Sequence, residues 1–314
     1  VYPFSDPLCI GKGEIEILSN MRVEADGTMV RRYELTGGGH TLTMEEVQTP
    51  GDSSWKARSR WIENDDDLAF FLELENLTPT DPDIEEVRQK ERQVGEHGLP
   101  YIETPDPFYL VCEMFPTDTF YIKTKIDVEP IMRILSLTKQ RVIHSIETLL
   151  SEAKCPFILR LIGAEMAAPP FMSRDNFLLF EGDFYQQVAD LIQQYDIPAS
   201  FHCHGSVGEI MDDIWNMGYS FIEPFEPSPR GNVTIAKALE TANGRGIVFG
   251  GVDDVIFNTG SPDDISRAVK RCLDDARGTG KPYILSQSST PFYEPLSGAA
   301  KENFLLFMEL GTQG

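Results

Sequence analysis

A helix and a short apolar strand alternate along most of the chain, and this repeat restricts the fold more than any other feature of the sequence. Because neighbouring parallel strands need a crossover connection, usually a helix, the repeat predicts an α/β fold with a parallel sheet. The predicted strands open at Leu99, Pro156, Ile197, Tyr219, Gly246 and Pro282. The predicted helices cover residues 83–98, 128–153, 174–195, 207–217, 233–242, 261–277 and 298–310.

Strands of this kind belong either to a closed barrel or to an open, doubly wound sheet. No GxGxxG or GxxxxGK[ST] phosphate loop follows any of the predicted strands, which removes the strongest argument for a dinucleotide or nucleoside triphosphate site. We therefore predict a (β/α)8 TIM barrel. Since a barrel needs eight strands, two more are expected before Leu99.

The first 64 residues have a different pattern. The segment MRVEADGTMVRRYEL alternates polar and apolar residues around the turn signal Asp26-Gly27, and three glycines interrupt the chain at 37–39. This pattern predicts a β-hairpin. We expect residues 1–64 to form a β-hairpin-rich extension packed on a barrel made of residues 65–314.

The charge of the chain excludes some classes of partner. Asp and Glu number 50 against 27 Lys and Arg, so the formal net charge is −23. Such a surface repels phosphate backbones and anionic lipid, and no run of 18 apolar residues exists to span a bilayer. The first residues lack the basic start and apolar core of a secretion signal, and five scattered cysteines without a CxxC pair fit reduced thiols. We predict a cytoplasmic protein without nucleic-acid or membrane partners.

Polar side chains gather where the predicted strands end. In parallel α/β folds the active site lies at the carboxyl ends of the strands, so these residues are the candidates for chemistry. Five strand ends contribute Glu165, His202 and His204, Glu223 and Glu226, Asp253 and Asp254, and Gln287, Ser288 and Ser289.

The triplet His202-Cys203-His204 is the sharpest of these features. Because side chains alternate along a strand, the two imidazoles are expected on one side and Cys203 on the other. Together with Glu165 on the neighbouring strand they would form a three-ligand site for a divalent metal, with one position open. The alternative is that one histidine caps a helix and the other bonds a carboxylate, with no metal.

The remaining acidic candidates also have structural alternatives. Glu223 and Glu226, in the proline-stiffened segment IEPFEP, can hold loop amides or a helix start as readily as take part in catalysis. Asp253 follows two glycines and can cap the next segment.

The C-terminal half resembles the uroporphyrinogen decarboxylase (URO-D) superfamily. The resemblance rests on the ordered segments FHCHGSVGEIMDDIWNMGYSFIEPFEP, GIVFGGVDD, KPYILSQSSTPF and KENF, and it extends from about Leu99 to Leu310. The superfamily joins a haem-pathway decarboxylase to zinc-dependent corrinoid methyltransferases on a (β/α)8 barrel. The decarboxylase has an arginine-rich N-terminal stretch for its polyanionic substrate, and the segment VYPFSDPLCIGKGE has no equivalent. The resemblance therefore favours the methyltransferase branch.

That branch carries a His-x-Cys zinc motif and a distant second Cys. Here His202 matches the histidine, whereas His204 and Ser289 stand where the cysteines belong. The resemblance implies zinc held by Glu165, His202 and His204, which would polarise a small acceptor. A partner protein would supply the methyl group on a corrinoid, and the enzyme would be a monomer or homodimer.

The candidates for catalysis are Glu165, Glu223 and Asp253. The residues expected to bind substrate are Glu226, Gln287, Ser288 and Ser289. Two other functions stay open: a metal-free decarboxylase of a small carboxylic acid, related to uroporphyrinogen decarboxylase, and a non-catalytic barrel that binds a small molecule.

Overall fold

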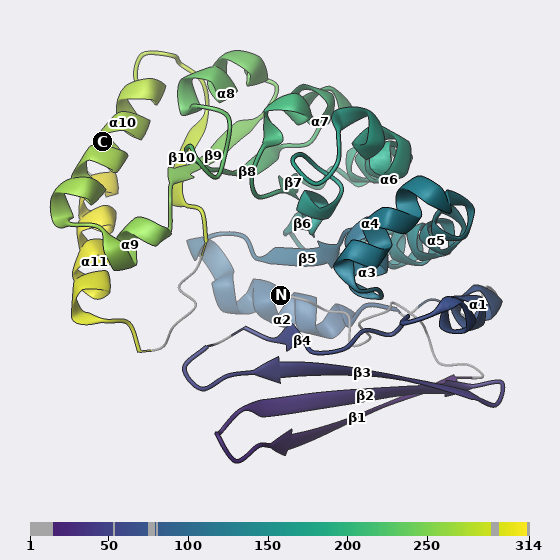
Figure 1. The fold of residues 1–314 in the computed structure, drawn as a ribbon. Coiled ribbons are helices and arrows are strands. Elements are labelled where there is room, and N and C mark those ends of the chain that lie inside the picture. Colours follow the sequence, from purple (N-terminus) through teal and green to yellow (C-terminus); the bar gives the residue numbers. More distant parts are fainter. Residues whose placement is uncertain (1–14, 53, 75–78, 80, 290–294, 313–314) are drawn as a thin grey trace. The chain divides into compact units, whose positions relative to one another are not determined.

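The chain forms two compact units, Val1–Pro156 and Phe157–Gly314. The computed structural model describes residues 15–52, 54–74, 79, 81–289 and 295–312 (Figure 1). Within these residues, no helix has both the length and the apolar character that crossing a membrane requires.

The first unit begins with an antiparallel sheet of four strands in the order β1-β2-β3-β4. Asp26 and Gly27 close the hairpin between β1 and β2: the Asp26 carboxylate accepts the Thr28 amide at 2.9 Å, and Gly27 has a φ of +87°. The predicted β-hairpin is therefore confirmed, and Val23 pairs with Met29 at its end. The four strands are β1 (Ile15–Val23), β2 (Met29–Gly37), β3 (His40–Gln48) and β4 (Lys56–Ala57).

Helices follow this sheet. The longest, α5 (Val128–Glu152), buries Ile131, Ile134 and Leu149, whose helical spacing predicted it. Three shorter helices before it, α1, α3 and α4, were not predicted. The remaining elements of the unit are α1 (Asp65–Glu73), α2 (Ile84–Val94), η2 (Gly95–His97), β5 (Tyr101–Pro105), α3 (Pro107–Glu113) and α4 (Thr117–Ile126).

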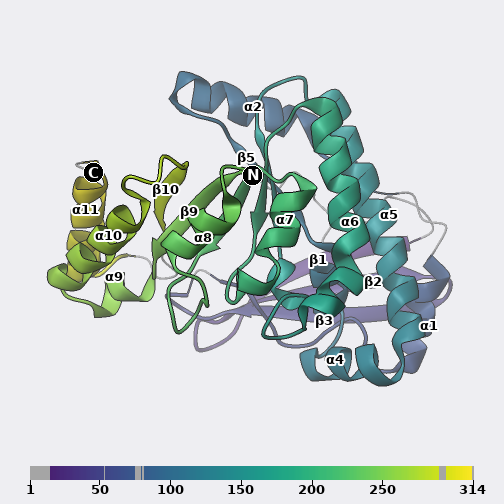
Figure 2. The ribbon, with the colours of Figure 1, turned by 90° about the horizontal axis from the view of Figure 1, so that it is seen from above.

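The second unit is built on five parallel strands. Strands adjacent in the sequence are adjacent in the sheet, in the order β10-β9-β8-β7-β6. Helices α6, α7 and α8 cover one face of this sheet (Figures 1 and 2). The strands are β6 (Ile158–Ile162), β7 (Ala199–His202), β8 (Phe221–Phe225), β9 (Ile247–Val252) and β10 (Tyr283–Gln287). The helices are η3 (Ala164–Met166), α6 (Arg174–Tyr195), η4 (Val207–Glu209), α7 (Met211–Met217), α8 (Ile235–Ala242), α9 (Val255–Thr259), α10 (Pro262–Ala276) and α11 (Gly298–Thr312).

The α/β prediction is confirmed, and all six predicted strands are present as β5 to β10. The closed (β/α)8 barrel is not confirmed, because in the described part of the chain the parallel strands do not close into a ring. Among the residues before Leu99 that the structure describes, no strand joins the parallel sheet. Tight turns at 26–27 and 37–39 pair the early strands with one another in antiparallel register instead. The predicted domain boundary after residue 64 lies shortly after β4, the last strand of the antiparallel sheet, and it remains a prediction.

Aromatic packing fixes which face of β7 is free for chemistry. Phe201 lies 5.0 Å from Tyr185 and 6.1 Å from Phe177, ring centre to ring centre, and both partners belong to α6. Tyr219 completes the cluster and donates its hydroxyl to the Tyr185 carbonyl at 3.1 Å. Burial of each such ring contributes roughly 1.5–3 kcal/mol. Because side chains alternate, Ser200 and His202 point to the opposite face.

Candidate functional site

His202 and His204 lie together at the end of β7, as predicted. Their ring centres are 4.8 Å apart, and the ring planes are nearly perpendicular, at 88°. Cys203 between them is fully buried. The alternation that predicted this arrangement is imposed by the packing of Phe201 against α6.

The inner cluster consists of Arg160, Ser200, His202 and Glu223. Parallel register places Arg160 of β6 beside Ser200 of β7, and His202 beside Glu223 of β8. Arg160 donates to both carboxylate oxygens of Glu223, at 2.8 and 3.2 Å, and the Ser200 hydroxyl donates to one of them at 2.7 Å. Glu223 is only 5% exposed, so a buried carboxylate is matched by a two-pronged guanidinium contact.

Arg160 also determines the protonation of His202. Its Nη2 lies 2.9 Å from Nδ1 of His202, and because a guanidinium only donates, Nδ1 must accept. A neutral ring then carries its proton on Nε2. Burial lowers the pKa of His202, and the positive charge of Arg160 acts in the same direction. The ring is therefore neutral at pH 7 and a donor at Nε2.

Glu223 stays ionised within this cluster. Burial by itself would raise the pKa of Glu223, but the guanidinium of Arg160 and the hydroxyl of Ser200 outweigh it and lower the pKa to about 2. Nδ1 of His202 is 3.9 Å from Oε2 of Glu223, which is beyond hydrogen-bonding distance. We therefore regard the Arg160 contact as the principal partner of this carboxylate.

The outer cluster consists of His204, Glu226 and Arg230. Nδ1 of His204 lies 3.4 Å from Oε1 of Glu226, whose other oxygen accepts the Gly205 amide at 2.7 Å. Gly205 adopts a φ of +89°, which a residue with a side chain would reach only under strain. Burial opposes the charged form of His204, but the carboxylates of Glu226 and Glu165 outweigh it and raise the pKa of His204.

Arg230 joins the outer cluster to the loop after β9. Its Nη1 lies 3.6 Å from Glu226, 3.6 Å from Asp253 and 2.5 Å from Asp254. Ser288 donates its hydroxyl to Asp254 at 2.9 Å and accepts the Asp254 amide at 3.0 Å. Asp253 accepts the amide of Val255 at 3.0 Å, in the first turn of α9, which matches the structural alternative considered for it.

A cavity of about 440 Å³ opens beside the outer cluster. It brings together four of the predicted residues, Glu165, His204, Glu226 and Ser289, and it adds Arg230 and Phe171 to them. His202, Glu223, Asp253, Gln287 and Ser288 are not among the residues that line it. The outer cluster thus faces open space, whereas the inner cluster serves as its support.

The donor atoms do not fit the predicted zinc site. Within the described ranges, no three His, Cys, Asp or Glu side chains are grouped so that they could hold a metal ion. The reason lies in the contacts of His202, whose Nδ1 accepts from Arg160. A neutral His202 in this tautomer has no lone pair left for a metal. One oxygen of Glu165 is buried without a hydrogen-bond partner among the described residues.

Three residues of the two clusters were not predicted from the sequence: Arg160, Ser200 and Arg230. Arg160 carried a usable signal, since it is the one charged residue of the apolar strand segment PFILRLIG. Ser200 stands two positions before His202 and therefore shares its face. Arg230 lies in the irregular loop PSPRGN, where spacing carries no directional information.

Comparisons with known proteins agree with this picture at the level of family and fold. Residues 123–290 match the model of the family described as Uroporphyrinogen decarboxylase (URO-D). The chain is similar to the structure of a methyltransferase from Methanosarcina mazei, with a TM-score of 0.58 and 15% identity over 83% of this chain and 73% of that one. A radical SAM methyltransferase from Sphaerobacter thermophilus matches at a TM-score of 0.24 and 11% identity, over 88% of this chain and 78% of that one, which is too distant to support an argument. No curated protein matches the sequence.

Proposed function

Because the chain belongs to the uroporphyrinogen decarboxylase (URO-D) family, we propose that it is an enzyme that transfers a methyl group between a corrinoid on a partner protein and a small acceptor. The single observation that carries the proposal is the cavity beside the outer cluster, where His204, backed by Glu226, lies on the wall. The fold shared with a methyltransferase is consistent with it. A cavity of about 440 Å³ also has the size of a small-molecule site.

An acceptor with an O–H, N–H or S–H group must lose its proton when it takes up a methyl group. The carboxylate of Glu226 faces Nδ1 of His204 and favours a proton there, which leaves the lone pair of Nε2 to accept the proton of the acceptor. The electron pair of the acceptor atom then forms the bond to the methyl carbon. A methyl-corrinoid, when bound, supplies the methyl group and keeps the electron pair of the bond that breaks.

The other residues of the site bind the acceptor or orient the side chains that contact it. Arg230 bridges Glu226 to Asp253 and Asp254 and so fixes the carboxylate that faces His204. Ser289 and Glu165 line the cavity and offer polar contacts to an acceptor. The inner cluster positions the end of β7 and does not touch the substrate. Because Nδ1 of His202 in the inner cluster already accepts from Arg160, no step is assigned to zinc.

Methyl transfer from free methylcobalamin to a panel of small thiols, phenols and amines tests the proposal. The change in cobalamin absorbance measures the rate. We expect activity with at least one acceptor, and we expect His204→Gln to lower the rate about 100-fold because the proton acceptor is lost. His144→Gln is the control, since His144 lies on α5 and pairs with Asp81 at 3.2 Å.

The outcomes separate the alternatives. Release of CO2 from a small carboxylic acid without any methyl donor would replace the proposal with the metal-free decarboxylase. Binding of small molecules without turnover of any of them would favour the non-catalytic barrel. Equal rates for His204→Gln and His144→Gln would remove His204 from the mechanism.

A further inference from the structure

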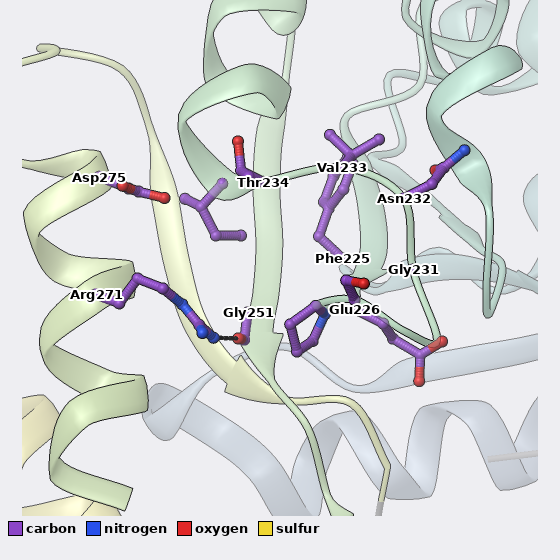
Figure 3. A pocket seen from close by; sticks show the side chains of 12 residues that line it. Phe225, Glu226, Gly231, Asn232, Val233, Thr234, Gly251, Arg271 and Asp275 are labelled. Carbon is purple, nitrogen blue, oxygen red and sulfur yellow. Dashed lines mark hydrogen bonds between the residues drawn. The ribbon is translucent and has the colours of Figure 1, made fainter. Parts of the chain in front are cut away.

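A second cavity, of about 430 Å³, lies between the end of β8, the start of α8 and helix α10 (Figure 3). Glu226 belongs to the walls of both cavities. Its two oxygens are held on the other side by His204 and the Gly205 amide, and in Figure 3 its carboxylate points away from Arg271. The second cavity is therefore separate from the proposed reaction site and has its own chemistry.

The close approach of α10 to β9 creates one side of this cavity. At Gly251, which has a φ of +108°, an added Cβ would lie 2.6 Å from Sγ of Cys272 and 2.8 Å from the Tyr283 hydroxyl. Cys272 donates its thiol to the Gly251 carbonyl at 3.2 Å. Only glycine permits this packing, and it sets α10 so that Arg271 reaches the rim of the cavity.

The walls of the cavity are mostly apolar. Phe225, Pro227, Val233 and Ile235 provide carbon surface from the end of β8 and the loop that leads into α8. Small-molecule sites combine such surface with a few well-placed polar groups. Besides Glu226, the charged groups here are Arg271 and Asp275, which lie one turn apart on α10.

The two charges differ in how they are neutralised. Asp275 accepts the amide of Ala236 at 3.3 Å, at the positive end of α8, so a helix terminus offsets its charge. Arg271 forms no ion pair with any carboxylate among the described residues, and its Nη2 lies 3.5 Å from the Gly251 carbonyl oxygen. A chain with 50 acidic and 27 basic side chains supplies carboxylates in excess, so an unpaired guanidinium beside an apolar cavity is a specific feature.

We propose that this second cavity binds an organic monocarboxylate. The carboxylate would take the planar fork of Arg271, and the carbon skeleton would lie against Phe225, Val233 and Ile235. This site goes beyond the proposed methyl transfer, and its test needs no catalytic activity.

Benzoate is a suitable probe, with benzyl alcohol as its uncharged counterpart and benzylamine as its cationic one. Isothermal titration calorimetry on the full chain should show benzoate binding, and binding of the other two at least about tenfold weaker, because a charged hydrogen bond is lost. Arg271→Gln should weaken benzoate binding by the same factor. Arg267→Gln, one turn away on α10 and paired with Asp264, should leave it unchanged.

Other variants locate the binding. Val233→Trp should fill the cavity and abolish benzoate binding, while Arg230→Gln alters only the first cavity and should have no effect. Thermal unfolding of each variant shows whether it is folded. Equal benzoate affinity in wild type and Arg271→Gln, or equal affinity for benzyl alcohol, would overturn the proposal. Loss of binding in Arg230→Gln but not in Arg271→Gln would assign the benzoate to the first cavity instead.

Discussion

The inner and outer clusters contain the same three residue types, a histidine, a glutamate and an arginine, yet their histidines behave in opposite ways. In the inner cluster the guanidinium of Arg160 faces Nδ1 of His202, and the pKa of His202 is lowered. In the outer cluster the carboxylate of Glu226 faces Nδ1 of His204, and the pKa of His204 is raised. Burial and the guanidinium act together on His202, whereas the carboxylate of Glu226 outweighs burial at His204.

Burial reinforces this difference. The side chain of His202 is 13% exposed and that of His204 is 36% exposed. The inner histidine is neutral and accepts a hydrogen bond from Arg160 on the neighbouring strand, and the outer one faces the cavity, where we propose it as a proton acceptor. Stability should therefore depend on the inner cluster, and activity on the outer one.

Removal of Arg160 is the change with the largest expected effect. Arg160→Ala leaves Glu223 buried without its main partner, so the free energy of unfolding should fall by about 3–5 kcal/mol. Arg174→Ala is the matched control, because Arg174 also contacts both oxygens of a carboxylate, that of Asp213, but on an exposed surface. The free energy of unfolding of this control, measured with urea, should fall by about 0–1 kcal/mol. Similar losses for the two variants would mean that the inner cluster is not a structural centre.

The acid stability of the protein should report on Glu223. The pKa of this carboxyl is about 2 in the folded state against an ordinary value of 4.5. A carboxyl whose pKa is lower in the folded state stabilises it above the unfolded pKa, and this contribution disappears as the pH falls through the folded one. The difference in unfolding free energy between wild type and Glu223→Gln should therefore shrink by about 3 kcal/mol from near pH 4.5 towards pH 2.

The exposed Glu302→Gln on α11 serves as the control for the acid titration. The difference in unfolding free energy between this variant and wild type should not change over the same pH range. If the difference in unfolding free energy between Glu223→Gln and wild type is also independent of pH, the pairing of Glu223 with Arg160 is contradicted.

Chemical modification compares the two histidines directly. Diethyl pyrocarbonate reacts with accessible neutral imidazole, so at a pH where both rings are neutral His204 should react faster than His202. Fragment-ion mass spectrometry separates the two sites. Faster modification of His202 would place the inner cluster at the open surface.

Zinc should have the smallest effect. Because His202 has no free lone pair in this tautomer, and the described residues hold no group of three ligating side chains, added zinc or a chelator should change the free energy of unfolding by less than about 0.5 kcal/mol, the size of a neutral surface change. The measurement is urea unfolding with and without each addition. A zinc-dependent stabilisation that disappears in His202→Ala would restore the metal site first predicted at Glu165, His202 and His204.

The sequence predicted the regular elements well where a long apolar stripe exists. Helix α6 has the predicted limits of 174 and 195, and α5 ends one residue before its predicted limit. Helices α1, α3, α4 and α9 have 9, 7, 10 and 5 residues, too short for a clear period, and were missed. The predicted barrel needed two further parallel strands, for which the sequence showed no pattern. The tight turns between the early strands pair these strands with one another instead.

For the site, strand alternation predicted that His202 and His204 lie together, but not what faces each nitrogen. That depends on register between β6, β7 and β8, which brings Arg160 and Glu223 to His202 from separate strands. Sequence patterns carry no such information about partners 42 and 21 residues away. The residues present do not fit the predicted metal site for this reason. Four of the residues chosen at strand ends, Glu165, His204, Glu226 and Ser289, line one cavity, and their roles remain predictions.

The most direct test compares the same substitution in the two clusters, Glu223→Gln and Glu226→Gln, measuring unfolding free energy and methyl-transfer rate on each protein. We expect Glu223→Gln to lose about 3 kcal/mol of stability, because Arg160 is left buried opposite a neutral amide. We expect Glu226→Gln to lose less stability than Glu223→Gln, because Arg230 keeps Asp253 and Asp254 as partners, and to lose about 100-fold in rate. A loss of rate in Glu223→Gln, together with full activity in Glu226→Gln, would contradict the division of roles between the clusters.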